Sequence, residues 1–225
     1  MTALYKNILF DLDGTLTDSA EGVTKSVQYA LKKYNIETTL EELKPFIGPP
    51  LQRSFKEVFG FSAETVDEVI EHYREYYREK GIYQNRVYPL IPELLSELEN
   101  RGINLYVATS KPTIFAEKIL RHFKLDHFFK AITGSNLDGT RVEKKDVITH
   151  VLKQMEERGD NANTVMVGDR KHDILGAKAC GLESIAVAYG YGSTAELEAA
   201  GPIHIAQSVE DLGKKLLGSN SLLKQ

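Results

Sequence analysis

The sequence predicts an α/β protein with a mostly parallel sheet and a helical segment inserted near its N-terminus. Short apolar runs that stop abruptly at polar residues recur along the chain, as in strands buried on both faces. Amphipathic helical patterns separate these runs, which implies right-handed crossovers between parallel strands. Residues 16–86 interrupt the alternation, because they carry helical patterns without a convincing strand.

The elements of the core follow one another regularly. Strands are expected at 5–10 (YKNILF), 103–110, 131–135, 164–169 and 183–190. Helices are expected at 92–102, 113–123, 145–159 and 172–181. Pro92 near the start and Gly102 after the end delimit the first of these helices. This order predicts a Rossmann-like, doubly wound core formed by residues 1–15 and 87–225, with a frayed tail, GSNSLLKQ.

Residues 16–86 are expected to form a helical cap domain over one edge of the sheet. Helical periodicity is present in SAEGVTKSVQYALKKYN, LQRSFKEVFG and AETVDEVIEHYREYYREKG. The block enters after the first strand and leaves before the next α/β unit, which is typical of an insertion. We expect its hinges near 15–19 and 80–88.

The composition limits the kinds of partner and the compartment that we expect for the protein. The chain has 225 residues, 42% hydrophobic and 27% charged, with a formal net charge of −4 and both signs dispersed. This argues against binding a nucleic acid polymer or an anionic membrane, but not against a small phosphorylated metabolite. Its single cysteine, Cys180, allows no intrachain disulfide, and no secretion signal or membrane-spanning run is present. We therefore expect a cytoplasmic protein, either a monomer or a dimer.

Polar residues gather where the predicted strands end. The first strand is followed by Asp11, Asp13, Gly14 and Thr15. The second ends at Thr109, Ser110 and Lys111, and the fourth is followed by Asp169 and Asp173, with Lys144 and Lys145 before the intervening helix. Ligands of an open parallel sheet bind at the carboxyl ends of its strands, so these residues are expected to converge.

The chemistry of this set indicates phosphoryl transfer. Several carboxylates facing one point require a hard cation, and Mg²⁺ accepts oxygen ligands while keeping waters that a phosphate can replace. Asp11 and Asp13 lie two apart on an extended chain and therefore address the same point. A hydroxyl and a lysine suit the oxygens of a phosphoryl group. Each residue alone has a structural explanation, so the prediction depends on the set.

The motifs resemble those of the haloacid dehalogenase-like hydrolase superfamily over nearly the whole chain. They are DLDGT (11–15), the threonine ending LYVAT (105–109), a lysine, and GDRKHD (168–173). Within the superfamily, DGTLTDSAEGV, IGPPL, TSKP and VAYGYG resemble the phosphoglycolate phosphatase-like branch, including its 5′-nucleotidase-like members.

The resemblance implies a role for each matching residue. Asp11 would attack phosphorus and form an aspartyl-phosphate, and Asp13 would serve as the acid and then the base. Mg²⁺ would be held by Asp11, the backbone carbonyl of Asp13, Asp169 and Asp173. Thr109, Ser110 and Lys144 would bind the phosphoryl group, because the spacing from LDGTR favours Lys144 over Lys145. Asp13 also indicates phosphate esters rather than carbon–halogen bonds.

The cap would select the substrate. In FIGPPLQR (46–53), Gly48, Pro49 and Arg53 are candidates for substrate contact, and a rigid turn with Arg53 in solvent is an equal alternative. We predict a Mg²⁺-dependent phosphatase for a small phosphomonoester such as phosphoglycolate, a 5′-nucleotide or pyrophosphate. A phosphosugar mutase of the β-phosphoglucomutase type is the main alternative, although Thr15 stands where such mutases usually have valine. A non-catalytic binding protein is a third, disfavoured because the four motif aspartates are all present.

Overall fold

The computed structural model describes residues 4–159 and 163–218. The chain forms two compact units, one made of residues 1–16 with 87–225 and the other of residues 17–86. The tail predicted to fray lies outside the described residues except for Gly218.

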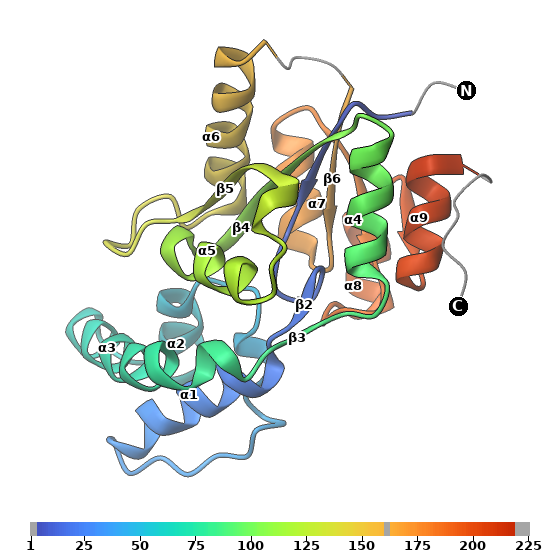
Figure 1. Cartoon of the computed structure of the whole chain (residues 1–225). Helices are drawn as coiled ribbons and strands as arrows, with labels where there is room; N and C mark the ends of the chain where they lie inside the picture. The colour runs from blue at the N-terminus through green and yellow to red at the C-terminus, as the bar shows by residue number, and fades with distance from the viewer. Residues whose placement is uncertain (1–3, 160–162, 219–225) are drawn as a thin grey trace. The chain divides into compact units, whose positions relative to one another are not determined.

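The first unit contains a six-stranded parallel sheet with the order β5-β4-β1-β6-β7-β8 (Figure 1). Its strands are β1 (Asn7–Phe10), β4 (Asn104–Pro112), β5 (Phe129–Ser135), β6 (Thr164–Gly168), β7 (Glu183–Val187) and β8 (His204–Ala206). Its helices are α4 (Ile91–Asn100), α5 (Thr113–His122), α6 (Lys144–Glu157), α7 (Lys171–Ala179), α8 (Thr194–Ala200) and α9 (Val209–Leu217), with the 3₁₀ turn η3 (Asp126–Phe128). The predicted α/β sheet is thereby confirmed.

Apolar side chains hold helices against both faces of this sheet. Leu9 of β1 packs with Tyr106 and Met166 of the neighbouring strands, under a buried stripe of α6. That stripe is Val147, Ile148, Val151 and Met155, a spacing that follows the helical period. Ile8 and Phe10 are also fully buried, and they point to the opposite face because successive strand residues alternate. On that second face α4 packs against β4 and α9.

Parallel pairing brings the carboxyl ends of β1, β4 and β6 to one edge. Phe10 is paired with Val107 on one side and with Val167 on the other. Asp11 directly follows β1, Asp169 directly follows β6, and Thr109 lies two residues beyond Val107 on β4, so all three lie toward the same end of the sheet. The strand order changes direction on either side of β1, which is where ligands bind in open α/β sheets.

The second unit is mostly helical. It contains β2 (Thr17–Asp18), α1 (Ala20–Lys32), η1 (Lys44–Phe46), α2 (Leu51–Phe59), α3 (Ala63–Glu79) and η2 (Gly81–Tyr83). Ser62 caps α3 by accepting the N–H of Thr65, and α2 ends at Gly60 with φ +66°. Four phenylalanines, Phe46, Phe55, Phe59 and Phe61, pack ring against ring between these elements.

Some elements were not predicted from the sequence. Residues 17–18 pair with β3 (Arg86–Val87) in a two-stranded sheet, at the two positions where hinges but no strands were expected. β8, α8 and α9 also went unpredicted, because strands and helices of three to nine residues give little periodicity. In the described part of the chain, no helix is both long and apolar enough to cross a bilayer.

Candidate active site

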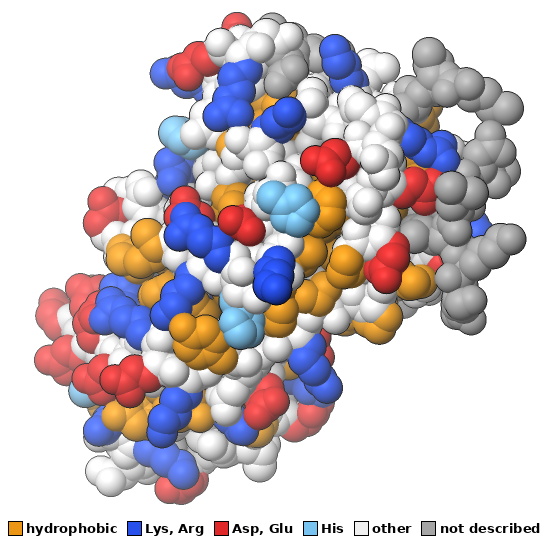
Figure 2. All heavy atoms as spheres, in the orientation of Figure 1, with side chains coloured by type: hydrophobic (Ala, Val, Ile, Leu, Met, Phe, Trp, Pro, Cys, Tyr) orange, Lys and Arg blue, Asp and Glu red, His pale blue; other side chains and the backbone are white. Residues whose placement is uncertain are grey.

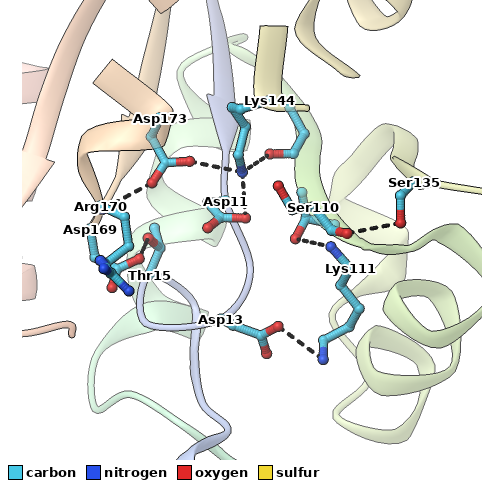
Figure 3. A network of polar contacts seen from close by, with 12 residues as sticks. Asp11, Asp13, Thr15, Ser110, Lys111, Ser135, Lys144, Asp169, Arg170 and Asp173 are labelled. Atoms are coloured by element: carbon cyan, nitrogen blue, oxygen red, sulfur yellow. Dashed lines mark hydrogen bonds and ion pairs between the residues drawn. The ribbon is translucent and has the colours of Figure 1, made fainter. Parts of the chain in front are cut away.

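The turn after β1 places Asp11 and Asp13 at the centre of the candidate site (Figure 3). The backbone N–H of Asp11 still bonds to Val167 O of β6 at 2.9 Å, so Asp11 extends the strand. Gly14 follows with φ +84°, a conformation that glycine adopts without strain. A Cβ at this position would lie 2.2 Å from Asp169 Oδ2, which is too close. Gly14 therefore allows the turn to approach the acidic residue that follows β6.

Asp11, Asp169 and Asp173 form a buried acidic cluster. One carboxylate oxygen from each lies within 4.8 Å of the other two. Burial raises the pKa of Asp169 well above its ordinary range, and the charges of Asp173 and Asp11 raise it further. Burial likewise raises the pKa of Asp173, although Lys144 opposes the shift. Three hard oxygen donors at this separation, with charges that repel one another, fit a divalent cation such as Mg²⁺.

Lys144, the first residue of α6, lies between two of these carboxylates. Its Nζ is 2.9 Å from Asp11 Oδ1 and 2.8 Å from Asp173 Oδ1, and it donates to Ala108 O at 2.9 Å. Burial disfavours the ammonium, but the charges of Asp11 and Asp173 outweigh it and raise the pKa of Lys144. Lys145 is exposed. Of the two neighbouring lysines considered from the sequence, the structure brings Lys144 to the site.

Lys111 also reaches the site, although no role was predicted for it from the sequence. Its Nζ is 2.9 Å from Asp13 Oδ2. The other oxygen, Asp13 Oδ1, is buried and has no hydrogen-bond partner among the described residues. Lys111 stands two residues after Thr109 on β4, in the stretch between Ala108 and Pro112 where the register against β5 shifts. The available sequence signal was its place in TSKP, directly after the threonine and serine candidates.

The phosphate-binding candidates on β4 are held in place by their neighbours. Thr109 is buried, and its Oγ1 accepts the N–H of Lys111 at 3.3 Å. The carbonyl of Ser110 accepts Ser135 Oγ at 2.8 Å. Both residues lie on β4, the strand that pairs with β1.

Asp169 is fixed by two hydrogen bonds. Thr15 Oγ1 donates to Asp169 Oδ1 at 3.3 Å, and the N–H of Tyr191 donates to Oδ2 at 2.8 Å. Tyr189 Oη in turn donates to the carbonyl of Thr15 at 3.0 Å. The loop after β7 therefore supports both the acidic cluster and the turn after β1.

The cap candidates belong to the second unit. Gly48 has φ +102° in the turn before α2, and Pro50 precedes the helix. Arg53 forms an exposed ion pair with Glu57, with 2.9 Å between Nε and Oε1. Contact of Gly48, Pro49 or Arg53 with a substrate stays a prediction.

Comparison with known proteins identifies the family of this chain. The family model described as haloacid dehalogenase-like hydrolase matches residues 8–187. The chain belongs to this family. The family and the enzyme class predicted from the sequence, a phosphatase of this superfamily, are confirmed.

Individual relatives cover almost all of the chain. A 5′-nucleotidase of Pseudomonas aeruginosa is 50% identical over 213 residues, which are 94% of this chain and 96% of that protein. The crystal structure of a predicted phosphatase from Clostridium acetobutylicum has a TM-score of 0.90 and 49% identity, covering 94% of this chain and 97% of the other. Tyrosine-protein kinase PtkA of Mycobacterium tuberculosis is 41% identical over 186 residues, which are 82% of this chain and 62% of that protein.

Proposed function

We propose that this phosphatase hydrolyses 5′-nucleotides, or phosphomonoesters of similar size such as phosphoglycolate, with Mg²⁺ through an aspartyl-phosphate. The observation that carries the proposal is the joint placement of Asp13, Lys111 and Lys144 with the buried acidic cluster of Asp11, Asp169 and Asp173 (Figure 3). The 50% identity with a 5′-nucleotidase favours nucleotides as the first substrates to test.

Each residue has a defined part in the proposed reaction. A carboxylate oxygen of Asp11 attacks phosphorus, and the bond to the ester oxygen breaks as the new P–O bond forms. Asp13 donates a proton to the departing oxygen. It then takes a proton from the water that attacks the aspartyl-phosphate, which releases phosphate and restores Asp11. Lys111 holds Oδ2 of Asp13. We therefore assign this proton transfer to the other oxygen of Asp13, the unbonded Oδ1.

The cation would be held by the carboxylates of Asp11, Asp169 and Asp173 with the backbone carbonyl of Asp13. When bound, Mg²⁺ would draw charge from the phosphoryl oxygens and offset the repulsion within the acidic cluster. Lys144 bridges two of these carboxylates, those of Asp11 and Asp173. Thr109 and Ser110 would bind the phosphoryl oxygens from β4.

A small charged metabolite suits the surface better than a polymer. On the face drawn in Figure 2, basic and acidic side chains alternate over short distances. The formal net charge is −4. Neither property provides the extended cationic surface that binds a nucleic acid backbone.

Phosphate release from a panel of esters tests the proposal. The panel contains 5′-nucleotides, phosphoglycolate, pyrophosphate and sugar phosphates, each with Mg²⁺ and with a chelator. We expect metal-dependent release, greatest for 5′-nucleotides, that is lost in Asp11→Asn and kept in Asp146→Asn, which alters an exposed residue of α6. If phosphate moves to a sugar hydroxyl or another acceptor instead of water, the mutase alternative replaces hydrolysis. If nothing reacts, the proposal fails.

A further inference from the structure

Glu196 of α8 binds the turn that joins Asp169 to Asp173. Its Oε1 accepts Arg170 Nε and the backbone N–H of Lys171, both at 2.9 Å. Its Oε2 accepts Arg170 Nη2 at 3.3 Å. Burial would raise the pKa of Glu196, but the bonds from Arg170 and Lys171 outweigh it and hold that pKa below its ordinary value. One charged carboxylate thus fixes a side chain and a backbone N–H of the same turn.

The turn carries both acidic residues that follow β6. Asp169 directly precedes Arg170, and the N–H of Arg170 donates to Asp173 Oδ2 at 3.0 Å. The residue whose guanidinium is held by Glu196 therefore orients the carboxylate of Asp173. A shift of Arg170 would move Asp169 and Asp173 together.

The backbone of the loop that leads to α8 lies close to Asp169. A Cβ on Gly190 would lie 2.3 Å from Asp169 Cβ and 2.4 Å from the carbonyl oxygen of Gly14. A Cβ on Gly192 would lie 2.1 Å from the carbonyl oxygen of Asp169. Between these two glycines, Tyr191 donates its N–H to the Asp169 carboxylate. Two independent contacts, one through this loop and one through Glu196, therefore set the orientation of the cluster.

We propose that Glu196 is a positioning residue for the divalent-cation site, acting through the Arg170–Lys171 turn. The inference rests on the proposed function, because it takes Asp169 and Asp173 as ligands of the cation. Groups that orient metal ligands commonly change metal affinity by about 10–100-fold when they are removed. In this role Glu196 affects the affinity for the cation even when no substrate is bound. Mg²⁺ binding can therefore be measured without turnover.

Calorimetric titration of Mg²⁺ into the metal-free full chain tests this role. We expect Glu196→Gln to weaken Mg²⁺ binding by roughly tenfold or more, because the neutral amide holds Arg170 less strongly. Glu97→Gln is the matched control. Glu97 pairs with Arg101 in the same unit, with 2.6 Å between Oε1 and Nη2, and lies on α4 away from the acidic cluster. This control should bind Mg²⁺ as the wild type does.

Arg170→Met provides a second variant in case Glu196→Gln does not fold. It removes the guanidinium that Glu196 holds and keeps the backbone N–H that Asp173 accepts, so we again expect weaker Mg²⁺ binding. A melting temperature lowered in Glu196→Gln with unchanged Mg²⁺ affinity would mean a structural role only and would overturn the inference. Wild-type protein that binds no Mg²⁺ and releases no phosphate would overturn the proposed function instead.

Discussion

The ammonium of Lys111 lies 2.9 Å from Oδ2 of Asp13, so the residue assigned to proton transfer is paired with a cation on the neighbouring strand. Both side chains are little exposed, at 6% for Lys111 and 12% for Asp13. A pair of this kind restricts the carboxylate to one orientation and leaves a single oxygen, Oδ1, for the substrate. The ion pair therefore fixes the orientation of the Asp13 carboxylate as well as balancing its charge.

Replacing Lys111 should slow turnover without abolishing it. In Lys111→Met the carboxylate of Asp13 loses its partner but remains present, so we expect kcat to fall by about 10–100-fold, less than the roughly 10²–10⁴-fold that a general acid–base group usually contributes. Lys118→Met, which alters an exposed lysine on α5, is the control. Steady-state phosphate release decides the outcome, and a Lys111→Met enzyme with wild-type kcat would contradict the positioning of Asp13 by this lysine.

We expect Gly14→Ala to inactivate the enzyme because the added methyl group collides with Asp169, and not because of backbone strain at position 14. The added methyl group would lie 2.2 Å from Asp169 Oδ2, so the turn or the carboxylate must move. We expect kcat to fall by roughly 100-fold, as misplacement of a catalytic group by about 1 Å can cause. Gly102→Ala is matched for backbone strain, since φ is +73° there, but nothing lies within 4 Å of its Cβ. Equal activity losses in the two variants would show that strain alone is responsible.

The sequence predicted the parts of the site that depend on local pattern. Asp11 and Asp13 follow from the period of an extended chain, and the sheet edge follows from the alternation of strands and helices. The choice of Lys144 over Lys145 came from its spacing from LDGTR in the resembling family. The structure adds a reason that was not used, because positions 144, 147, 148, 151 and 155 are buried on one face of α6 and 145 is not.

Contacts between distant segments were not predictable in this way. Glu196 meets Arg170 across 26 positions, and no motif in the sequence connects them. Tyr191 acts through its backbone N–H, which side-chain identity does not reveal. Substrate contact by Gly48, Pro49 and Arg53 stays a prediction, because no local pattern in FIGPPLQR encodes what these residues bind.

Tyr5 should give the protein a measurable pH dependence in alkaline solution. Burial raises the pKa of Tyr5 to about 12, aided by its hydrogen bond of 3.0 Å to Glu183 Oε2. An unfolded tyrosine ionises near pH 10. Between these values the native chain binds a proton that the unfolded chain has lost, so stability falls as pH rises from about 10 to 12.

Urea unfolding at a series of pH values measures this contribution. We expect the free energy of unfolding to decline less steeply above pH 10 in Tyr5→Phe than in wild type. Glu183→Gln removes the neighbouring charge and lowers the native pKa of Tyr5, so the decline should end at a lower pH and be smaller in total. Parallel curves for Tyr5→Phe and wild type would show that the Tyr5 hydroxyl does not contribute.

The adjacent residues Lys144 and Lys145 allow a direct comparison of a buried and an exposed cation. Lys144 contacts Asp11 and Asp173, and its removal leaves those buried carboxylates without their shared partner. Loss of one member of a buried ion pair usually costs about 3–5 kcal/mol. We therefore expect Lys144→Met to lose phosphate release and to unfold at lower urea concentration, whereas Lys145→Met should match wild type in both measurements.

Adding Mg²⁺ distinguishes the loss of stability in Lys144→Met from its loss of phosphate release. A cation bound at Asp11 and Asp173 replaces part of the missing positive charge, so Mg²⁺ should raise the melting temperature of Lys144→Met more than that of wild type. Activity should stay low at the same Mg²⁺ concentration, because the cation does not restore the lysine that orients Asp11. If Lys145→Met were instead the inactive variant, the assignment of Lys144 to the site would be wrong. If saturating Mg²⁺ restored both stability and turnover to Lys144→Met, the lysine would serve only to neutralise charge.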